Sequence, residues 1–105
     1  MPKPSEILNA KTWIKGAYGR LPDGSYNNTY SRHELRDQAK YFEAFCMLGA
    51  CVKCGLEEGD CIVKMAPIVE KRFNDRYKAY KMSDFNDHED TTLEDVISVL
   101  KEAGL

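Results

Sequence analysis

The chain has 105 residues, of which 43% are hydrophobic and 30% are charged, so it fits one compact domain over 1–105 and excludes a second. Its 15 basic and 17 acidic residues give a formal net charge of -2, which excludes the strong positive field that general nucleic-acid binding needs. The longest mainly apolar run, 42–52, is shorter than the roughly 20 residues of a membrane-spanning helix, and the opening residues lack the apolar segment of a signal peptide. We therefore expect a cytoplasmic protein that binds neither nucleic acid nor membrane.

The first two predicted elements are a helix and a β-hairpin. Apolar residues at helical spacing, after Ser5 as the candidate cap, predict a helix from about Glu6 to Lys15 that ends at Gly16. Tyrosines and a threonine favour extended backbone between 17 and 30, and the run 21–24 supplies turn residues in the middle. This segment is predicted to form a short hairpin, whose second arm is either a regular strand or a loop.

A long central helix is the main predicted element. Ser31 and Glu34 form a capping box at its start, and apolar residues at spacings of three and four continue until Gly55. The run 45–52 is apolar on almost all sides, which is typical of a helix covered by several neighbours. We predict that this helix forms the centre of the core, with Cys46 packed inside.

Two more helices are predicted in the second half of the chain. Pro67 suits the first position of a helix that continues to about Tyr80, and the run 83–90 is expected to be a loop. Residues 91–94 form a second capping box, which opens an amphipathic last helix. The elements together predict a mainly α fold of the α+β class, with about four helices packed around the central buried helix and one short hairpin near the N-terminus.

Four cysteines fall within a short stretch, at Cys46, Cys51, Cys54 and Cys61. Cys51 and Cys54 have the two-residue gap that zinc and redox sites use. However, they lie on a predicted helix, whereas a zinc ribbon presents such ligands from a glycine-containing knuckle. The leading prediction is therefore buried thiols with no metal or other cofactor, and a structural zinc domain built on these four cysteines stays as an alternative.

A second alternative is a small thiol-dependent enzyme. Cys46 is the candidate nucleophile and His88 the candidate base, with Asn86 or Asp87 orienting the imidazole ring. The predicted helix places Cys46 about four turns from its start, away from the end where the helix dipole lowers the pKa of a thiol. The prediction therefore leans against an enzyme and leaves the question open.

Several aromatic residues of the N-terminal part either fill the core or line a groove. Tyrosine suits a groove because its ring offers contact area and its hydroxyl a polar end. On this basis we select candidate binding residues at Trp13, Tyr18 and Tyr26, together with Asn86 in the predicted loop before the last helix.

Three motifs occur in order over about Ile7 to Ala103: residues 13–18, residues 45–50, and Phe85-Asn86-Asp87 leading into 92–96. In this order they resemble a family of small bacterial and phage-encoded proteins, the domain-of-unknown-function family numbered six thousand one hundred and ninety-seven. The resemblance implies no activity. The positions that it singles out are Trp13, Gly16, Cys46, Gly49, Asn86 and Asp87; Phe85 stands where the family commonly has tryptophan.

The leading functional hypothesis is a non-enzymatic binding or interaction module. The sequence contains no phosphate-binding glycine loop, no metal motif of good spacing and no well-placed acid–base pair. A chain of this length also leaves apolar surface uncovered, which favours association. We therefore predict a protein partner or self-association, as in a phage-type accessory protein, and leave a small-molecule ligand open.

Overall fold

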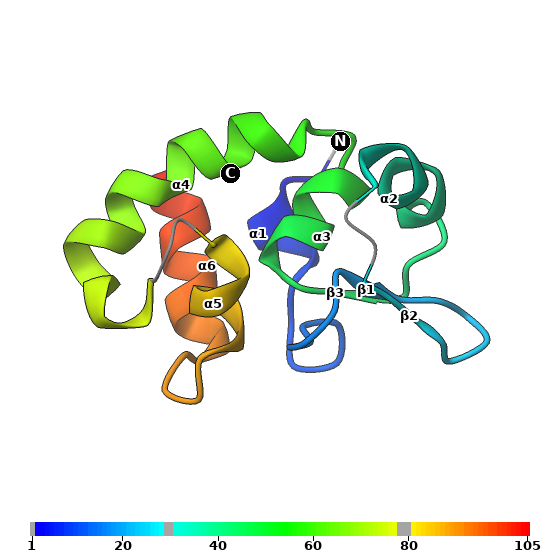
Figure 1. The fold of residues 1–105 in the computed structure, drawn as a ribbon, viewed down its shortest axis with the longest axis horizontal. Coiled ribbons are helices and arrows are strands. Elements are labelled where there is room, and N and C mark those ends of the chain that lie inside the picture. The colour runs from blue at the N-terminus through cyan, green and yellow to red at the C-terminus, as the bar shows by residue number, and fades with distance from the viewer. Residues whose placement is uncertain (1, 29–30, 78–80) are drawn as a thin grey trace.

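The computed structural model describes residues 2–28, 31–77 and 81–105. In these ranges the chain forms mainly helices, with a small three-stranded sheet at one side of the molecule, which confirms the mainly α, α+β class (Figure 1). None of the helices in these ranges is long and apolar enough to span a membrane. The elements, in chain order, are α1 (Pro4–Ile7), β1 (Gly19–Arg20), β2 (Tyr26–Asn27), α2 (Arg32–Ala39), β3 (Ala44–Phe45), α3 (Met47–Lys53), α4 (Glu58–Phe73), the 3-10 helix η1 (Asn74–Arg76), α5 (Met82–Asp87) and α6 (Leu93–Glu102).

The first helix is much shorter than predicted, because α1 ends at Ile7. The side-chain oxygen of Asn9 accepts hydrogen bonds from the backbone N–H groups of Lys11 (2.8 Å) and Thr12 (3.1 Å), which folds the chain into a turn. Trp13 then forms an isolated parallel bridge with Phe45. The prediction of a helix to Lys15 is wrong, since an asparagine side chain competes there with the helical hydrogen bonds.

The predicted hairpin is present, with β1 and β2 paired antiparallel so that Gly19 lies opposite Asn27. The second arm is therefore a strand at 26–27, and residues 29 and 30 of the predicted arm lie outside the described residues. Strand β3 pairs with the other edge of β1, which gives the sheet order β2-β1-β3. This third strand comes from the middle of the predicted central helix.

The predicted central helix is in fact two helices with β3 between them. The Glu43 N–H donates to the Arg20 carbonyl (2.8 Å) and the Phe45 N–H to the Thr12 carbonyl (2.6 Å), so backbone groups that a helix would use are taken by the sheet and by the N-terminal loop. The prediction of one helix from 31 to 55 is wrong. As a result, Cys46 is the residue directly before α3 and is not a residue of a helix interior.

Helix α4 starts earlier than predicted and passes through Pro67, which was expected to start a helix. A proline inside a helix cannot donate to the carbonyl four residues before it, here that of Val63. Val63 is 73% exposed, so this weak point lies on the solvent side of the helix. Residues 78–80, including Tyr80 at the predicted end of this helix, lie outside the described residues.

The segment 83–90 is a helix in its first half, and not the loop that was predicted. Helix α5 includes Phe85, which is completely buried and pulls the segment onto the core. The next helix, α6, begins one residue later than the predicted capping box: Thr92 accepts from the Asp95 N–H (3.2 Å), and the Asp95 carboxylate accepts from the Thr92 N–H (3.1 Å).

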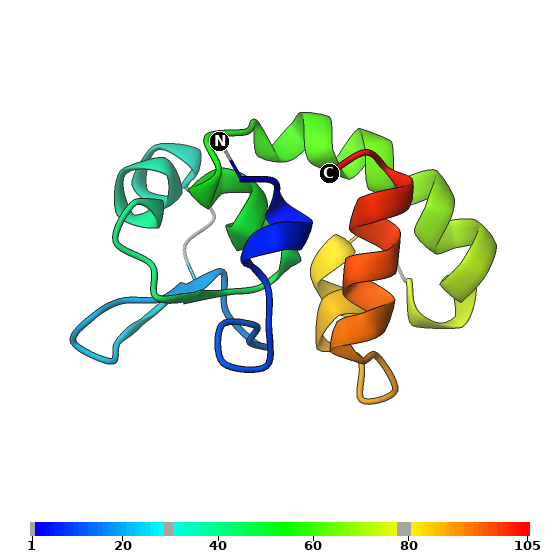
Figure 2. The same ribbon diagram turned by 180° about the vertical axis from the view of Figure 1, so that it is seen from behind.

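The centre of the core is α3, which packs against α1, α2, α4 and α5. Helix α4 crosses the top of the molecule in Figure 1, from the α3 side to the α5 and α6 side. Figure 2 shows α1 and α6 on the opposite face; there the Ser5 N–H donates to the Leu105 carbonyl (3.1 Å), which ties the first helix to the last residue. The largest completely buried side chains include Met47, Met65, Val69, Met82, Phe85, Val96 and Leu100.

Candidate functional site

The three motif segments meet at the side chain of Asn86, which is completely buried in α5. Its oxygen accepts from the Trp13 indole N–H (2.8 Å) and from the Met47 backbone N–H (3.1 Å). Its amide nitrogen donates to the Ile14 carbonyl (3.1 Å) and to the Asp87 carboxylate (2.9 Å). These four bonds use the full capacity of the amide group. Asn86 therefore joins the N-terminal loop, the start of α3 and α5 at one point.

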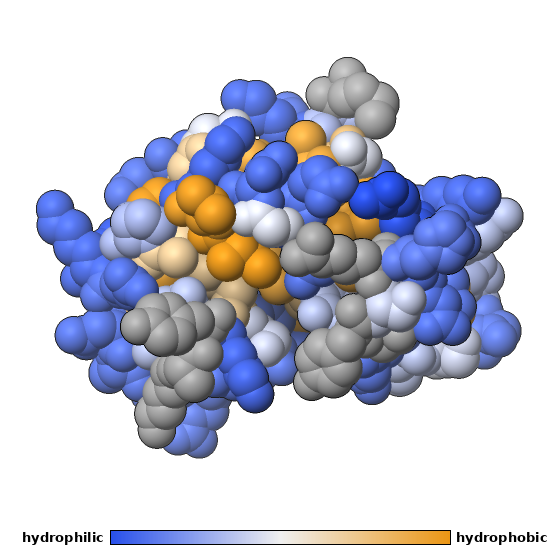
Figure 3. All heavy atoms as spheres, turned by 45° about the horizontal axis from the view of Figure 1, so that its top comes forward, coloured by the Kyte–Doolittle hydropathy of each residue, from blue (hydrophilic) through white to orange (hydrophobic). Residues whose placement is uncertain are grey.

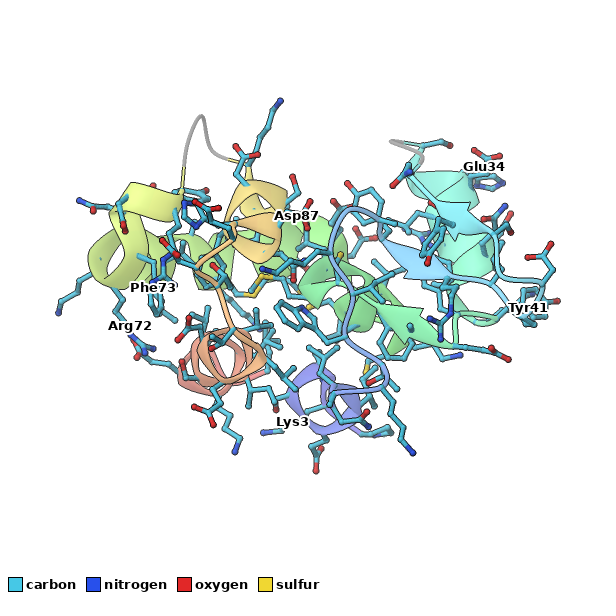
Figure 4. The ribbon with its side chains drawn as sticks, turned by 90° about the horizontal axis from the view of Figure 1, so that it is seen from below. Lys3, Glu34, Tyr41, Arg72, Phe73 and Asp87 are labelled. Atoms are coloured by element: carbon cyan, nitrogen blue, oxygen red, sulfur yellow. The ribbon has the colours of Figure 1, made fainter. Side chains whose placement is uncertain are left out.

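Asp87 holds the loop that follows Trp13. One oxygen of its carboxylate, Oδ1, accepts from the Gly16 backbone N–H (2.9 Å) as well as from Asn86. Gly16 has a φ of +85°, a left-handed conformation that side chains rarely adopt. The glycine therefore allows the loop to turn its N–H toward α5. Figure 4 labels Asp87 on this helix.

Gly49 allows the backbone at Tyr18 to lie directly on α3. A Cβ atom added at Gly49 would be 1.8 Å from the Tyr18 carbonyl oxygen, so no larger residue fits without a backbone shift. The same oxygen accepts from the Cys46 N–H (3.1 Å). Steric contact thus explains why a glycine stands at position 49 of the motif 45–50: the N-terminal loop packs directly against the backbone of α3 at this residue.

Cys46 is the N-cap of α3, and its sulfur accepts a hydrogen bond from the Gly49 N–H at 3.3 Å. The side chain is only 5% exposed. Burial raises the pKa of the Cys46 thiol to about 12, and the negative charges of Asp87 and Glu58 add to this, although hydrogen bonds from Gly49 and Leu48 oppose it. The predicted position deep inside a helix is wrong, because Cys46 lies at the start of α3. Near neutral pH its side chain is nevertheless an uncharged thiol, since its pKa is raised to about 12.

A pocket of about 340 Å³ opens beside this junction. Its volume is at the lower end of the range for small-ligand sites, about 300 to 1,000 Å³. Its walls come from the loop before β1, the residue after β2, the cap of α3 and one face of α5. The described lining residues are Gly16, Ala17, Tyr18, Asn28, Cys46, Ser83 and Asp87.

The sequence model of DUF6197, a family of unknown function, matches residues 5–104. The chain belongs to this family. The resemblance carried by the three motifs is therefore confirmed. No curated protein and no solved structure is detectably similar to the chain.

The four predicted binding residues of this DUF6197 chain have different places around the pocket. Tyr18 lines it. Trp13 and Asn86 hydrogen-bond to each other and hold the segments that form its walls. Tyr26, on β2, is 58% exposed and is not among the described lining residues. Their role in binding stays a prediction.

The three predicted catalytic residues are only partly brought together. Cys46 and Asp87 line the same pocket, whereas His88 lines a neighbouring recess with Arg76, Asp84 and Asp87. The ring nitrogen Nδ1 of His88 accepts from the Asp90 N–H (3.1 Å). Within the described ranges Cys46 has no hydrogen bond to either histidine. Catalysis by this set stays a prediction.

The other cysteines of this DUF6197 chain lie at the opposite end of α3 or on α4. All four cysteines are buried free thiols. The Cys51 thiol shares a hydrogen bond with Cys61 across the contact between the helices, and this bond raises the pKa of Cys51. Among the described residues, no three His, Cys, Asp or Glu side chains come together as a metal-ligand set. The four-cysteine zinc cluster is therefore not assembled in this part of the chain.

Ser83, which lines the pocket, and Glu58, which contacts a lining residue, were not identified from the sequence. Ser83 lies four residues before Asp87, so the two share one face of a helix; this signal was available only if 82–87 had been predicted as helical. Glu58 accepts from the Tyr18 hydroxyl at 3.4 Å, although the two residues lie far apart in the chain. Nothing in the local sequence indicates such a contact.

Proposed function

We propose that this domain is a non-enzymatic binding module, and that the pocket at the motif junction holds a group of its ligand. The supporting observation is that the family motifs converge on one cavity. Gly16, Cys46 and Asp87 line it, while Trp13 and Asn86 hold its wall segments in place. Hydrogen bonds between the wall segments form the pocket without a ligand, as is usual for small-molecule sites.

The state of Cys46 supports binding over thiol catalysis. A thiol nucleophile acts as its thiolate, and an adjacent imidazole or a lowered pKa normally provides that form. Here burial raises the pKa of Cys46 to about 12, and the described lining residues include no histidine. We assign the Cys46 thiol to the wall of the pocket, as a compact neutral group.

A protein partner or a second copy of the chain remains part of this proposal. The pocket has room for one inserted side chain or a small molecule. Hydrophobic residues also gather on the face that carries α4, shown in Figure 3. Exposed apolar side chains of this part of the chain include Val63 on α4 and Leu56 just before it. Self-association is tested separately by light scattering: a monomer at high protein concentration would exclude it.

A fragment titration followed by NMR tests the pocket. Fragments of different charge and polarity are added to the labelled protein, and we expect shifts of backbone signals at residues 16–18, 46, 83 and 87. The variant Ser83→Phe places a ring at the mouth of the pocket and should abolish these shifts. Glu70→Phe, on the exposed side of α4, is the matched control and should keep them. Shifts that all lie elsewhere would contradict the proposal.

Thiol labelling tests the enzyme alternative. The native protein is treated with iodoacetamide near pH 7, and each cysteine is followed by mass spectrometry. We expect Cys46 to react hundreds of times more slowly than in the unfolded chain, because its thiol is buried and protonated. Cys54, at 9% exposure the most accessible of the four cysteines, is the internal reference. Rapid labelling of Cys46 in the folded protein would favour a thiol enzyme instead.

A further inference from the structure

We propose that the pocket selects a primary ammonium group on a short apolar stem, with the Asp87 carboxylate as its counter-charge. This proposal rests on the proposed function, since it assigns a ligand class to the same pocket.

Asp87 is fixed in position but its charge is not neutralised by the described residues. Its Oδ1 atom accepts from two neutral donors, the Gly16 N–H and the Asn86 side-chain amide, both at 2.9 Å. Among the described residues it forms no ion pair with a lysine, arginine or histidine. The second carboxylate oxygen, Oδ2, has no hydrogen bond within the same ranges. A held, unneutralised carboxylate at the edge of a cavity favours a cation there.

A second carboxylate adds to the negative potential of the pocket. Glu58 accepts from the hydroxyl of Tyr18, whose residue lines the cavity. Both Glu58 and Asp87 lie near enough to Cys46 to disfavour its thiolate by charge repulsion. An anionic ligand would meet the same repulsion.

Two described basic side chains near Asp87, those of Lys15 and Arg76, bind groups other than its carboxylate. The Lys15 ammonium donates to the His88 carbonyl at 2.6 Å, and the Arg76 guanidinium pairs with Asp95 at 2.9 Å. The described lining residues themselves include no lysine, arginine or histidine. The described walls of the cavity therefore carry one acidic side chain, that of Asp87, and no basic one.

The remaining walls fit a short carbon chain next to the charge. Ala17, Tyr18 and the neutral thiol of Cys46 offer apolar surface, and the Ser83 hydroxyl adds an acceptor on α5. A primary amine is protonated at neutral pH because its pKa is about 10.4, as for lysine. The same chemistry is found in a free small amine and in a lysine side chain of a partner protein.

The test compares three probes of one shape by NMR titration near pH 7: n-butylamine, which is cationic, n-butanol, which is neutral, and butyrate, which is anionic. We expect n-butylamine to shift the signals of residues 16–18, 46, 83 and 87. Its dissociation constant should be at least tenfold lower than those of the other two probes. Binding should weaken with added salt, as for any pair of exposed charges.

The variant Asp87→Asn removes the charge and keeps an oxygen that can accept from Gly16 and Asn86. We expect n-butylamine binding to weaken at least tenfold, while Glu70→Gln, which removes an exposed carboxylate on α4, leaves it unchanged. A melting curve checks that the Asp87 variant folds; if it does not, Glu58→Gln replaces it and should weaken binding two- to threefold.

Two results separate this proposal from the proposed function. If n-butanol or butyrate binds the pocket as tightly as n-butylamine, or if Asp87→Asn binds the amine unchanged, the ammonium proposal is wrong while the pocket stands as a binding site. If no probe and no fragment shifts the pocket signals, both fail. Tighter binding of Nα-acetyl-lysine amide than of cadaverine would identify a lysine side chain as the source, and the reverse order a free diamine.

Discussion

The two ends of α3 use the same residue type in opposite surroundings. At the N-terminal end, Cys46 caps the helix, faces a pocket and lies beside the buried amide of Asn86. At the C-terminal end, Cys51 is completely buried and meets Cys61 of α4. The first end is held mainly by hydrogen bonds to distant segments. The second is held mainly by the packing of buried side chains, with one hydrogen bond between two thiols.

This difference predicts at which end of α3 a substitution costs less stability. Buried polar groups cost free energy when a partner is removed, because each is left without a hydrogen bond. Apolar contacts lose free energy more gradually, with the volume removed. Substitutions at the N-terminal end of α3 should therefore have the larger effects, unless they preserve the hydrogen-bonding atoms.

The largest effect is expected for Gly49→Ala. The added methyl group meets the backbone oxygen of Tyr18, which cannot move without shifting the loop and its bond to Cys46. We expect a loss of more than about 3 kcal/mol in the free energy of unfolding, measured by urea denaturation.

Gly59→Ala is the matched control, because Gly59 also lies in a helix and an added Cβ there meets nothing within 4 Å. Alanine should stabilise the protein at that site by about 0.5 kcal/mol. Equal losses for the two variants would show that the close approach of the loop to α3 is not formed in solution.

The next largest effect is expected for Asn86→Ala. The substitution leaves the Trp13 indole N–H and the Met47 N–H without their acceptor, so we expect a loss of about 2 to 3 kcal/mol. Trp13→Phe removes only one of these bonds and should cost about 1 kcal/mol by the same measurement. A smaller loss for Asn86→Ala than for Trp13→Phe would contradict the assignment of Asn86 as the junction.

A paired serine substitution compares the two ends of α3 directly. Serine is a preferred N-cap residue, so Cys46→Ser should change the stability by less than about 0.5 kcal/mol. Cys51→Ser places a more polar hydroxyl in a completely buried position beside the weakly hydrogen-bonding Cys61 thiol, and it should cost about 1 to 2 kcal/mol. A larger loss of stability for Cys46→Ser than for Cys51→Ser in thermal denaturation would mean that the surroundings of the two cysteines have been assigned wrongly.

The fold class could be predicted because helical periodicity and capping residues are local signals. The positions at which a predicted helix is interrupted or continues could not be predicted in this way. The helix expected at 31–55 is divided by β3, and that division depends on backbone bonds to Thr12 and Arg20, which are distant in sequence. The continuation of α4 through Pro67 likewise depends on packing that overrides a local preference.

The residues of the site could be predicted from the sequence, but their roles could not. Trp13, Cys46, Asn86 and Asp87 were singled out by the motifs, and the structure brings their segments together. Their roles were not predictable, because the burial of Cys46 and the full use of the Asn86 amide are properties of the assembled fold.

The smallest effect is expected from ionisation of Cys46, which changes the stability only at alkaline pH. Comparison of the wild type with Cys46→Ser isolates this effect. The folded-state pKa of Cys46 is raised to about 12 by burial, whereas an exposed thiol titrates near 9.0. Below about pH 8.5 both states keep the proton, so the group contributes no pH dependence. Between about pH 9 and pH 12 the unfolded chain loses the proton first, and the folded state of the wild type is therefore destabilised relative to the variant as pH rises.

The measurement is the difference in unfolding free energy between wild type and Cys46→Ser at several values of pH. Lysines and tyrosines also titrate in this range, but they are present in both proteins and cancel in the difference. We expect the difference to grow in favour of the variant as the pH rises from about 9. A difference that stays constant would mean that the folded protein ionises Cys46 as easily as the unfolded chain does. In that case the N-terminal end of α3 is open to water, and the contrast with its closed C-terminal end would be greater than the structure shows.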